Sequence, residues 1–404
     1  MKPIVITGAA RTAVGGYLGS LKTVEAQDLG AAVLVEAAKR GGVKLDQVDQ
    51  VIMGDVYGYT PNVARCSSLI AGIPIEVPAF VVDRQCASSL QAVVSAVYEI
   101  NADEADVVLA GGVETMSRMV YYLDPSTRSE PLRIGNKQLY DTFFRGVTIV
   151  QPKSLYPDLN MGLTAENVAT KYGITREEQD AFAVDSQVKM AKAVEEGKFK
   201  DEIVPFEVKL RKESFIFDKD EHPKPDTTME ELAKLRPVFR TDGGGSVTPG
   251  NSSGMNDGAS AVVVMSEDKA KELGAKPLVK VVSICASGVD PNIMGIGPVP
   301  SIKGALKKAG LKLEDIDLFE LNEAFAAQSL GVLKELGMDM GTELYKKVNV
   351  NGGAIAHGHA LANSGTRLLT TLIYEMKRRN SKYGLVSLCI GGGQGLTMIV
   401  ENCQ

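Results

Sequence analysis

The chain has 404 residues and a formal net charge of −6, with 44% hydrophobic and 23% charged residues. This composition excludes a disordered chain, and the acidic balance offers no basic footprint for nucleic acid. No stretch approaches the ~18 consecutive apolar residues of a membrane-spanning helix. The first residues lack the basic and apolar regions of a secretory signal, so we expect a cytoplasmic protein that binds neither nucleic acid nor membrane.

Strand-like and helix-like runs alternate along the first 120 residues, which predicts an α/β fold. Pro3–Val14 is typical of a first strand. Residues 36–55 predict a helix, a glycine stop, an acidic turn and a buried strand, and Val107–Gly112 predicts a late strand that ends in glycines. We expect 1–120 to form an N-terminal half, completed by about 247–276, where Ala259–Met265 predicts a returning strand.

The middle of the chain, 121–246, has a different character, with much proline and charge and little strand pattern. Thr175 and Glu178 have the spacing of a capping box and open an amphipathic helix. We interpret 121–246 as an inserted loop domain that covers a site. Asp242–Ser246 is typical of a flexible return.

The last part of the chain repeats the first. Residues 304–323 follow the same order of helix, glycine, acidic turn and strand as 36–55. Pro277–Gly288 resembles Pro3–Val14, and Leu385–Gly392 resembles Val107–Gly112. This internal duplication predicts two α/β halves of the same topology, with the C-terminal half at 277–404.

Cys86 lies where a buried strand is expected to end and a helix to begin. Backbone N–H groups and the positive end of the dipole at a helix N-terminus favour a thiolate, which predicts a lowered pKa and a reactive thiol. A small apolar core cysteine is an equally good interpretation of this stretch alone. The five cysteines are widely spaced and form no CxxC pair, so a disulfide framework is disfavoured.

Asn322 follows the expected strand of the second half. An asparagine at a strand end can hold a water or an oxyanion. The alternative is a helix cap, and the stretch alone favours the cap.

Two of the three histidines, His357 and His359, lie in a polar, glycine-rich loop. A histidine here can activate a thiol or donate to an oxyanion. A zinc site has weak support, because His-x-His stands without a CxxC pair. A loop histidine without a role stays open as an alternative.

Cys389 ends a strand and precedes three glycines, among them Gly391, whose backbone N–H groups are suitable oxyanion donors. The alternative is a buried cysteine beside a tight turn. Neither a phosphate-binding loop nor a dinucleotide fingerprint is supported, since the required lysine and glycine patterns are missing.

These stretches all lie where a strand meets the next loop or helix, and in a parallel sheet such positions gather at one crevice. The motifs together resemble the thiolase family over nearly the whole chain. They are Gly111–Ser117, Met161–Asn167, Gly250–Gly258, Val289–Pro298, Asn322–Gln328, Asn349–Gly353 and Cys389–Gly395.

The resemblance implies a thiolase-like fold of two five-stranded α/β halves with an inserted loop domain. It also implies a two-step acyl transfer that makes or cleaves 3-ketoacyl-CoA. Coenzyme A and acyl-CoA would be substrates, with no permanently bound cofactor and no metal, and the protein would be a homodimer or homotetramer.

The resemblance also implies roles for individual residues, which are assigned where their positions match the family's motifs. Cys86 resembles the acylated nucleophile, His359 the residue that activates it, and Cys389 the acid/base at the α-carbon. Asn322, through a water, and His359 would stabilise the enolate oxygen. The N–H groups of Cys86 and Gly391 would form a second oxyanion hole. Ser253 and Met161 resemble the wall of the pantetheine tunnel.

The chain departs from the family pattern around His359. Ala360 replaces a proline, Ala362 replaces a glycine, and Asn363 is added. His357 stands where an apolar residue is usual, and Ser89 and Asn160 stand for a glycine and, in many biosynthetic members, a histidine. We expect Ala362 and Asn363 to alter either the approach of the backbone or the acyl pocket, and His357 to line the acyl or pantetheine channel.

Two rival functions follow from the same features. A condensing enzyme for carrier-protein thioesters has a similar fold but uses His or Asn where Cys389 stands, so Cys389 argues against it. A thiolase-like subunit that binds acyl-CoA without turnover is favoured only by the altered surroundings of His359.

Overall fold

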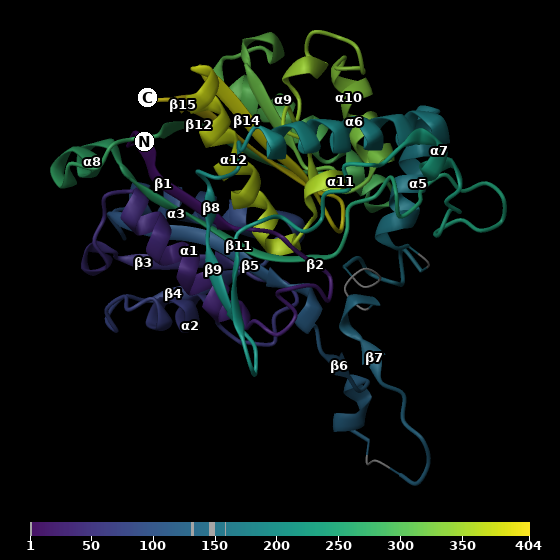
Figure 1. The fold of residues 1–404 in the computed structure, drawn as a ribbon, viewed down its shortest axis with the longest axis horizontal. Helices are drawn as coiled ribbons and strands as arrows, with labels where there is room; N and C mark the ends of the chain where they lie inside the picture. Colours follow the sequence, from purple (N-terminus) through teal and green to yellow (C-terminus); the bar gives the residue numbers. More distant parts are fainter. Residues whose placement is uncertain (1, 131–132, 145–149, 158) are drawn as a thin grey trace.

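The computed structural model describes residues 2–130, 133–144, 150–157 and 159–404. One continuous sheet runs through the molecule in the order β13-β14-β15-β12-β1-β11-β5-β3-β4 (Figure 1). The strands of the first half are β1 (Ile4–Thr12), β3 (Gln50–Gly54), β4 (Ala79–Val82), β5 (Val107–Thr115) and β11 (Asn256–Ser266). Those of the second half are β12 (Val279–Gly288), β13 (Leu318–Leu321), β14 (Tyr383–Ile390) and β15 (Gln394–Asn402). Two short strands, β2 (Gly15–Gly16) and β8 (Ile203–Val204), pair with β11 and β1.

The two halves have the same strand order when each is followed outward from the centre of the sheet. There β1 and β12 pair antiparallel through Val5 with Lys280 and Ile6 with Val279. The predicted α/β class and the duplication are therefore confirmed. The second half differs in one respect, because its counterpart of β4 is reduced to a single parallel bridge between Phe319 and Val348.

Helices cover the sheet in layers. Helices α3 (Ser88–Asn101) and α12 (Ser364–Arg379) contact each other and share one apolar cluster with strands of both halves. Helices α1 (Ala26–Arg40) and α2 (Val63–Ile70) pack on the first half, and α9 (Pro298–Ala309) and α10 (Ala326–Leu336) belong to a cluster with strands of the second. A short helix α8 (Glu267–Leu273) follows β11.

Helix α3 begins just after Cys86, as expected, and it buries Leu90, Val93, Val94 and Val97 on one face. The strand before it differs from the expectation. All residues of β4 are only half-buried, because β4 is the last strand at one edge of the sheet.

The segment between the halves contains helices α5 (Met161–Tyr172), α6 (Arg176–Glu195) and α7 (Met229–Ala233). The capping box of Thr175 and Glu178 is present at the start of α6, and α5 and α6 contact α10 of the second half. The pair β6 (Tyr121–Tyr122) and β7 (Tyr140–Asp141) lies on an arm that extends away from the body (Figure 1). The hairpin of β9 (Phe206–Lys209) and β10 (Ser214–Phe217) runs beside the first half.

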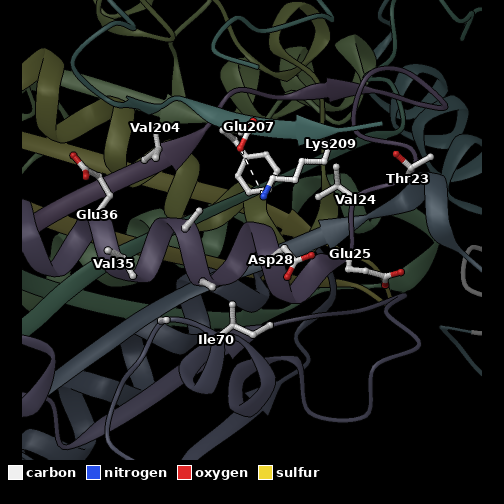
Figure 2. Close-up of a pocket in the computed structure, with 14 residues that line it drawn as sticks. Thr23, Val24, Glu25, Asp28, Val35, Glu36, Ile70, Val204, Glu207 and Lys209 are labelled. Carbon is white, nitrogen blue, oxygen red and sulfur yellow. Dashed lines mark ion pairs between the residues drawn. The ribbon is translucent and has the colours of Figure 1, made fainter. Parts of the chain in front are cut away.

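An open groove of about 660 Å³ lies between α1, the end of α2 and the strands β8 and β9 (Figure 2). Its lining includes the ion pair of Glu207 and Lys209 and the carboxylates of Glu25, Asp28 and Glu36. None of the residues that the sequence singled out lines this groove. No helix within the described ranges is long and apolar enough to cross a membrane.

Candidate active site

Cys86 sits in a single turn of 3-10 helix, Gln85–Ala87, between β4 and α3. The turn is held by its neighbours. Asp83 accepts a hydrogen bond from the Gln85 N–H at 2.8 Å, and the Ser88 hydroxyl accepts from the Arg84 N–H at 2.9 Å and donates to the Gln85 carbonyl at 2.6 Å. Gln85 itself has φ 46°, a left-handed conformation that side chains rarely adopt. This fixed turn determines where the thiol of Cys86 lies.

The thiol of Cys86 is protonated in the resting protein. Burial raises its pKa to about 11, although backbone N–H groups of Gly391 and Cys86 hydrogen-bond to the sulfur and oppose the rise. The expectation of a lowered pKa is therefore wrong, because the cost of burying a thiolate outweighs these donors. A base must take the proton of the thiol before or during attack. The contact does place the Gly391 N–H beside Cys86, as the second predicted oxyanion hole requires.

His359 lines the same cavity as Cys86, and the contacts of its ring fix its tautomer. Its Nδ1 lies 2.6 Å from the Ser364 hydroxyl, which donates in turn to the Ala360 carbonyl at 3.0 Å. The hydroxyl has one proton, so it accepts from Nδ1–H and the lone pair is left on Nε2. Nε2 has no hydrogen-bonding partner among the described residues. Burial, with Arg367 nearby, lowers the pKa of His359 to about 3, so the ring is neutral at pH 7.

The backbone before His359 depends on glycine. Gly358 has φ 97°, and a Cβ built on it would lie 2.5 Å from the Asn256 side chain. Asn256 Oδ1 accepts from the His359 N–H at 2.9 Å, so this close approach orients the loop.

We expect Gly358→Ala to lower kcat by about 10²-fold, because a shift of about 1 Å in a reacting group has an effect of this order. Steady-state thiolysis of acetoacetyl-CoA measures the change. Gly310→Ala is the matched control, because Gly310 also has positive φ but ends α9 with open space around it. Equal losses in the two variants would contradict a specific effect on His359.

Cys389 lies near the end of β14 and is buried against Met294 and Ala324, with Met161 and Phe325 packed on the same cluster. Burial raises the pKa of its thiol, and the nearby Cys86 adds to the rise. The two sulfurs are therefore close enough to interact. Gly392 and Gly393 both have positive φ and form the tight turn into β15.

Asn322 follows β13 directly, and its backbone N–H donates to the Ser387 carbonyl of β14 at 3.0 Å. Its side chain is buried, and neither its amide oxygen nor its amide nitrogen has a partner within the described part of the chain. The amide is not a helix cap, since α10 begins with Phe325 as its capping residue. A free buried amide fits the predicted role of holding a water at the enolate oxygen.

A cavity of about 540 Å³ opens onto Cys86 and His359, whereas Cys389 and Asn322 are not among the residues that line it. Cys86 and His359 line it together with Ser253 and Met161, the two residues predicted for the tunnel wall. Most of the remaining lining is apolar. It includes Tyr57, Met116, Phe143, Phe144, Asn160, Val238, Phe239, Met255, Met294, Phe325 and Leu361.

The expectation that His357 lines the acyl or pantetheine channel is wrong. His357, Ala362 and Asn363 are all buried outside the lining, and it is Leu361 that faces the cavity. The Asn363 amide oxygen instead accepts from the Ser260 hydroxyl at 2.6 Å.

Sequence reasoning missed two buried carboxylates that support the site. Glu114 accepts hydrogen bonds from the backbone N–H groups of Tyr57 and Ala362, each at 3.1 Å. Glu323 accepts from the Ser186 hydroxyl at 2.7 Å, from Asn349 at 2.6 Å and from the Ile355 N–H at 3.2 Å. Each carboxylate joins loops that are distant in sequence. Glu114 lies within the motif Gly111–Ser117 and Glu323 within Asn322–Gln328, and membership of these motifs is the one sequence feature that could have indicated their role.

Within the described ranges, no group of three or more His, Cys, Asp or Glu side chains is arranged to hold a metal ion. The cavity and its immediate surroundings supply the Cys86 thiol, the His359 imidazole and the Gly391 N–H, with the Cys389 thiol close to Cys86. Such a set can exchange a thioester at one sulfur and move a proton at a second.

Comparison with known proteins agrees with this chemistry. The family model for the N-terminal domain of thiolase matches residues 4–268, and the model for the C-terminal domain matches residues 275–402. The chain belongs to the thiolase family. It is an acyltransferase of this family, and coenzyme A enters thiolase reactions as a substrate.

The relatives cover the whole length of this thiolase. The acetyl-CoA acetyltransferase of Syntrophomonas wolfei is 50% identical over 99% of this chain and 99% of its own. That of Escherichia coli is 48% identical, with the same coverage of both chains. Among solved structures, the acetyl-CoA acetyltransferase of Bacillus anthracis superposes with a TM-score of 0.93 at 45% identity, covering 100% of this chain and 99% of its own. The human mitochondrial 3-ketoacyl-CoA thiolase in complex with CoA gives 0.92 at 44% identity, covering 99% and 98%.

Proposed function

We propose that this thiolase is an acetyl-CoA C-acyltransferase that works through an acyl group on Cys86. In the first step the Cys86 sulfur attacks the thioester carbonyl, and His359 Nε2 takes the thiol proton. The C–S bond to coenzyme A breaks, and His359 returns the proton to the leaving thiolate. The N–H groups of Cys86 and Gly391 hold the oxyanion of the tetrahedral intermediate.

In the second step the Cys389 thiol passes its proton to His359 Nε2, and the resulting thiolate removes a proton from the α-carbon of a second acetyl-CoA. A water on Asn322 and the His359 ring stabilise the enolate oxygen. The α-carbon attacks the acyl carbonyl on Cys86, the C–S bond breaks, His359 gives its proton to the Cys86 sulfur, and 3-ketoacyl-CoA is released. Thiolysis runs through the same steps in reverse.

One observation carries this proposal. The Cys86 sulfur accepts the Gly391 N–H, and the free Nε2 of His359 belongs to the same cavity. A nucleophile, an oxyanion donor and a base of suitable tautomer thus occupy one site. Cys389 interacts with the same sulfur and supplies the second acid/base.

We expect incubation with acetyl-CoA to leave one acetyl group on Cys86, found by peptide mass spectrometry, with release of an equal amount of coenzyme A. Cys86→Ser should show no stable thioester, and Cys285→Ala should react as the natural protein does. An adduct on Cys66, Cys285 or Cys403 would contradict the mechanism. Failure to acylate would favour a binding subunit without turnover, and acylation only from carrier-protein thioesters would favour the other rival.

We further propose a homodimer or homotetramer in the cytoplasm. The arm around β6 and β7 exposes Tyr121, Leu139 and Phe144, side chains that are typical of protein contacts. All five cysteines are free thiols, which suits a reducing compartment. For domain boundaries we propose 1–120 with 247–276, 121–246 as the inserted loop domain, and 277–404. The capping of α5 and α6 inside the insert supports this division.

A further inference from the structure

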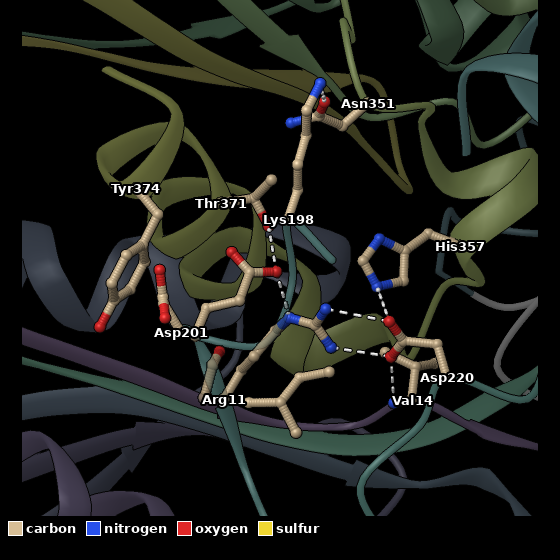
Figure 3. A network of polar contacts seen from close by, with 12 residues as sticks. Arg11, Val14, Lys198, Asp201, Asp220, Asn351, His357, Thr371 and Tyr374 are labelled. Atoms are coloured by element: carbon tan, nitrogen blue, oxygen red, sulfur yellow. Dashed lines mark hydrogen bonds and ion pairs between the residues drawn. The ribbon is translucent and has the colours of Figure 1, made fainter. Parts of the chain in front are cut away.

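A buried charged cluster lies beside the active-site loop but outside the cavity (Figure 3). It consists of Arg11, Glu202, Asp220 and His357, and we call it the Arg11 cluster. Arg11 donates from Nε to Glu202 at 2.7 Å and from its two terminal nitrogens to the oxygens of Asp220 at 2.8 and 3.0 Å. The cluster joins β1, the inserted segment and the loop that carries His359.

His357 completes this cluster. Its Nε2 lies 3.2 Å from an oxygen of Asp220. The Phe199 ring contacts both His357, at 5.2 Å between ring centroids, and the Arg11 guanidinium, at 5.4 Å. Although burial opposes it, Arg11 and His357 hold the pKa of Asp220 well below its usual range, and burial lowers the pKa of His357 to about 4. A neutral ring therefore faces an ionised carboxylate within polar-contact distance, although the contact lacks the alignment of a hydrogen bond.

A chain of hydrogen bonds connects the surroundings of His357 to His359 through the loop after β1. Asp220 accepts the Val14 N–H at 2.8 Å. The neighbouring Gly15 carbonyl accepts from the Asn256 amide at 2.9 Å, and Asn256 accepts the His359 N–H at 2.9 Å. Val14 is thus connected to His357 through Asp220, and the adjacent Gly15 is connected to His359 through Asn256. The path of the chain into His359 is fixed from two directions.

We propose that His357, held by Asp220, is a positioning residue that sets the place of His359 against Cys86. His357 is fully buried and does not line the cavity, so it acts only through the loop. This inference rests on the proposed role of His359 as the base for Cys86. It replaces the expectation that His357 lines the acyl or pantetheine channel.

The test compares two substitutions at His357. Leucine is similar in size to histidine and is apolar, like the residue that the family pattern places here. It cannot make the polar contact with Asp220. Glutamine keeps an N–H donor of similar reach. We expect His357→Leu to lower kcat and the acylation rate of Cys86 by acetyl-CoA about 10- to 100-fold, with KM little changed. His357→Gln should recover most of both rates.

Glu221→Gln is the matched control. Glu221 is next to Asp220 and accepts from the Gly16 N–H at 2.9 Å, so it binds the same loop after β1 without touching His357. This variant should acylate Cys86 at the natural rate. The thermal unfolding midpoint of each variant separates a loss of positioning from a loss of folded protein.

Acylation by His357→Leu at the natural rate would overturn the inference while leaving the proposed function in place. Equal losses in His357→Leu and His357→Gln, in step with their unfolding midpoints, would also overturn it, because the donor would then have no specific effect. Absence of acylation in the natural protein would overturn the proposed function, and with it the role of His357.

Discussion

Cys389→Ala should still become acylated on Cys86 but should lose carbon–carbon bond formation and cleavage by about 10²- to 10⁴-fold, the range for a positioned acid/base. The acylation step needs only the Cys86 thiol, the His359 Nε2 and the N–H donors, and none of these depends on the Cys389 sulfur. The α-carbon step needs a second base for a weakly acidic C–H. Cys389 is buried in contact with the apolar cluster of Met294 and Ala324, so alanine leaves the packing largely intact.

Two measurements separate the half-reactions of this variant. Mass spectrometry after brief mixing with acetyl-CoA follows acylation, and steady-state thiolysis of acetoacetyl-CoA follows the full reaction. Cys285→Ala is the control, because Cys285 lies half-buried on β12, away from the cavity lining. Normal thiolysis by Cys389→Ala would remove this thiol from the mechanism.

His359→Ala should lose both half-reactions. A thiol with a pKa of about 11 carries a thiolate fraction on the order of 10⁻⁴ at pH 7, so acylation without a base is slow. Loss of the base is expected to lower the acylation rate by about 10²- to 10⁴-fold at this pH. The enolate oxygen also loses its hydrogen-bond donor at His359. Even after a longer incubation has acylated Cys86, the acyl-enzyme should therefore condense poorly with a second acetyl-CoA.

The pH dependence of acylation identifies this effect. In His359→Ala the thiolate is the only nucleophile, and its population rises about tenfold per pH unit below the pKa of about 11. The acylation rate should rise with this slope from pH 7 to 10. The natural protein should depend less steeply on pH, because His359, with a pKa lowered to about 3, is already unprotonated across this range. Parallel pH profiles would show that His359 is not the base.

The duplication could be predicted because hydrophobic patterns and glycine stops are local and repeat along the chain. The sequence also indicated that Cys86, His359 and Cys389 lie close together, since strand ends in a parallel arrangement meet at one edge. The place of Asn322 at the same site stays a prediction. The pKa of Cys86 could not be predicted. It depends on how deeply the turn is buried, and this burial is set by η8 (Leu361–Asn363) and β14, elements far away in the sequence.

The surroundings of His359 were harder still to predict. Asn363 and His357 stand next to active-site residues in sequence, but their side chains turn toward Ser260 and Asp220. Neighbours in a loop need not share a face, and only the tertiary contacts decide which side chain enters the cavity. The carboxylate of Asp220 belongs to an irregular segment for which no periodicity exists.

The contact between α3 and α12 joins equivalent parts of the two duplicated halves. One of these helices starts just after Cys86 and the other just after His359, so the proposed nucleophile and its proposed base hold equivalent places in the two halves. Ser89, at the start of α3, accepts the Thr366 N–H of α12 at 2.9 Å and couples the two helix beginnings directly. The strands β1 and β12 share only a short pairing at the centre of the sheet. Each half of the chain therefore contributes one of these two residues. The contact between α3 and α12 links the start of one helix to the start of the other, and so links the positions of Cys86 and His359.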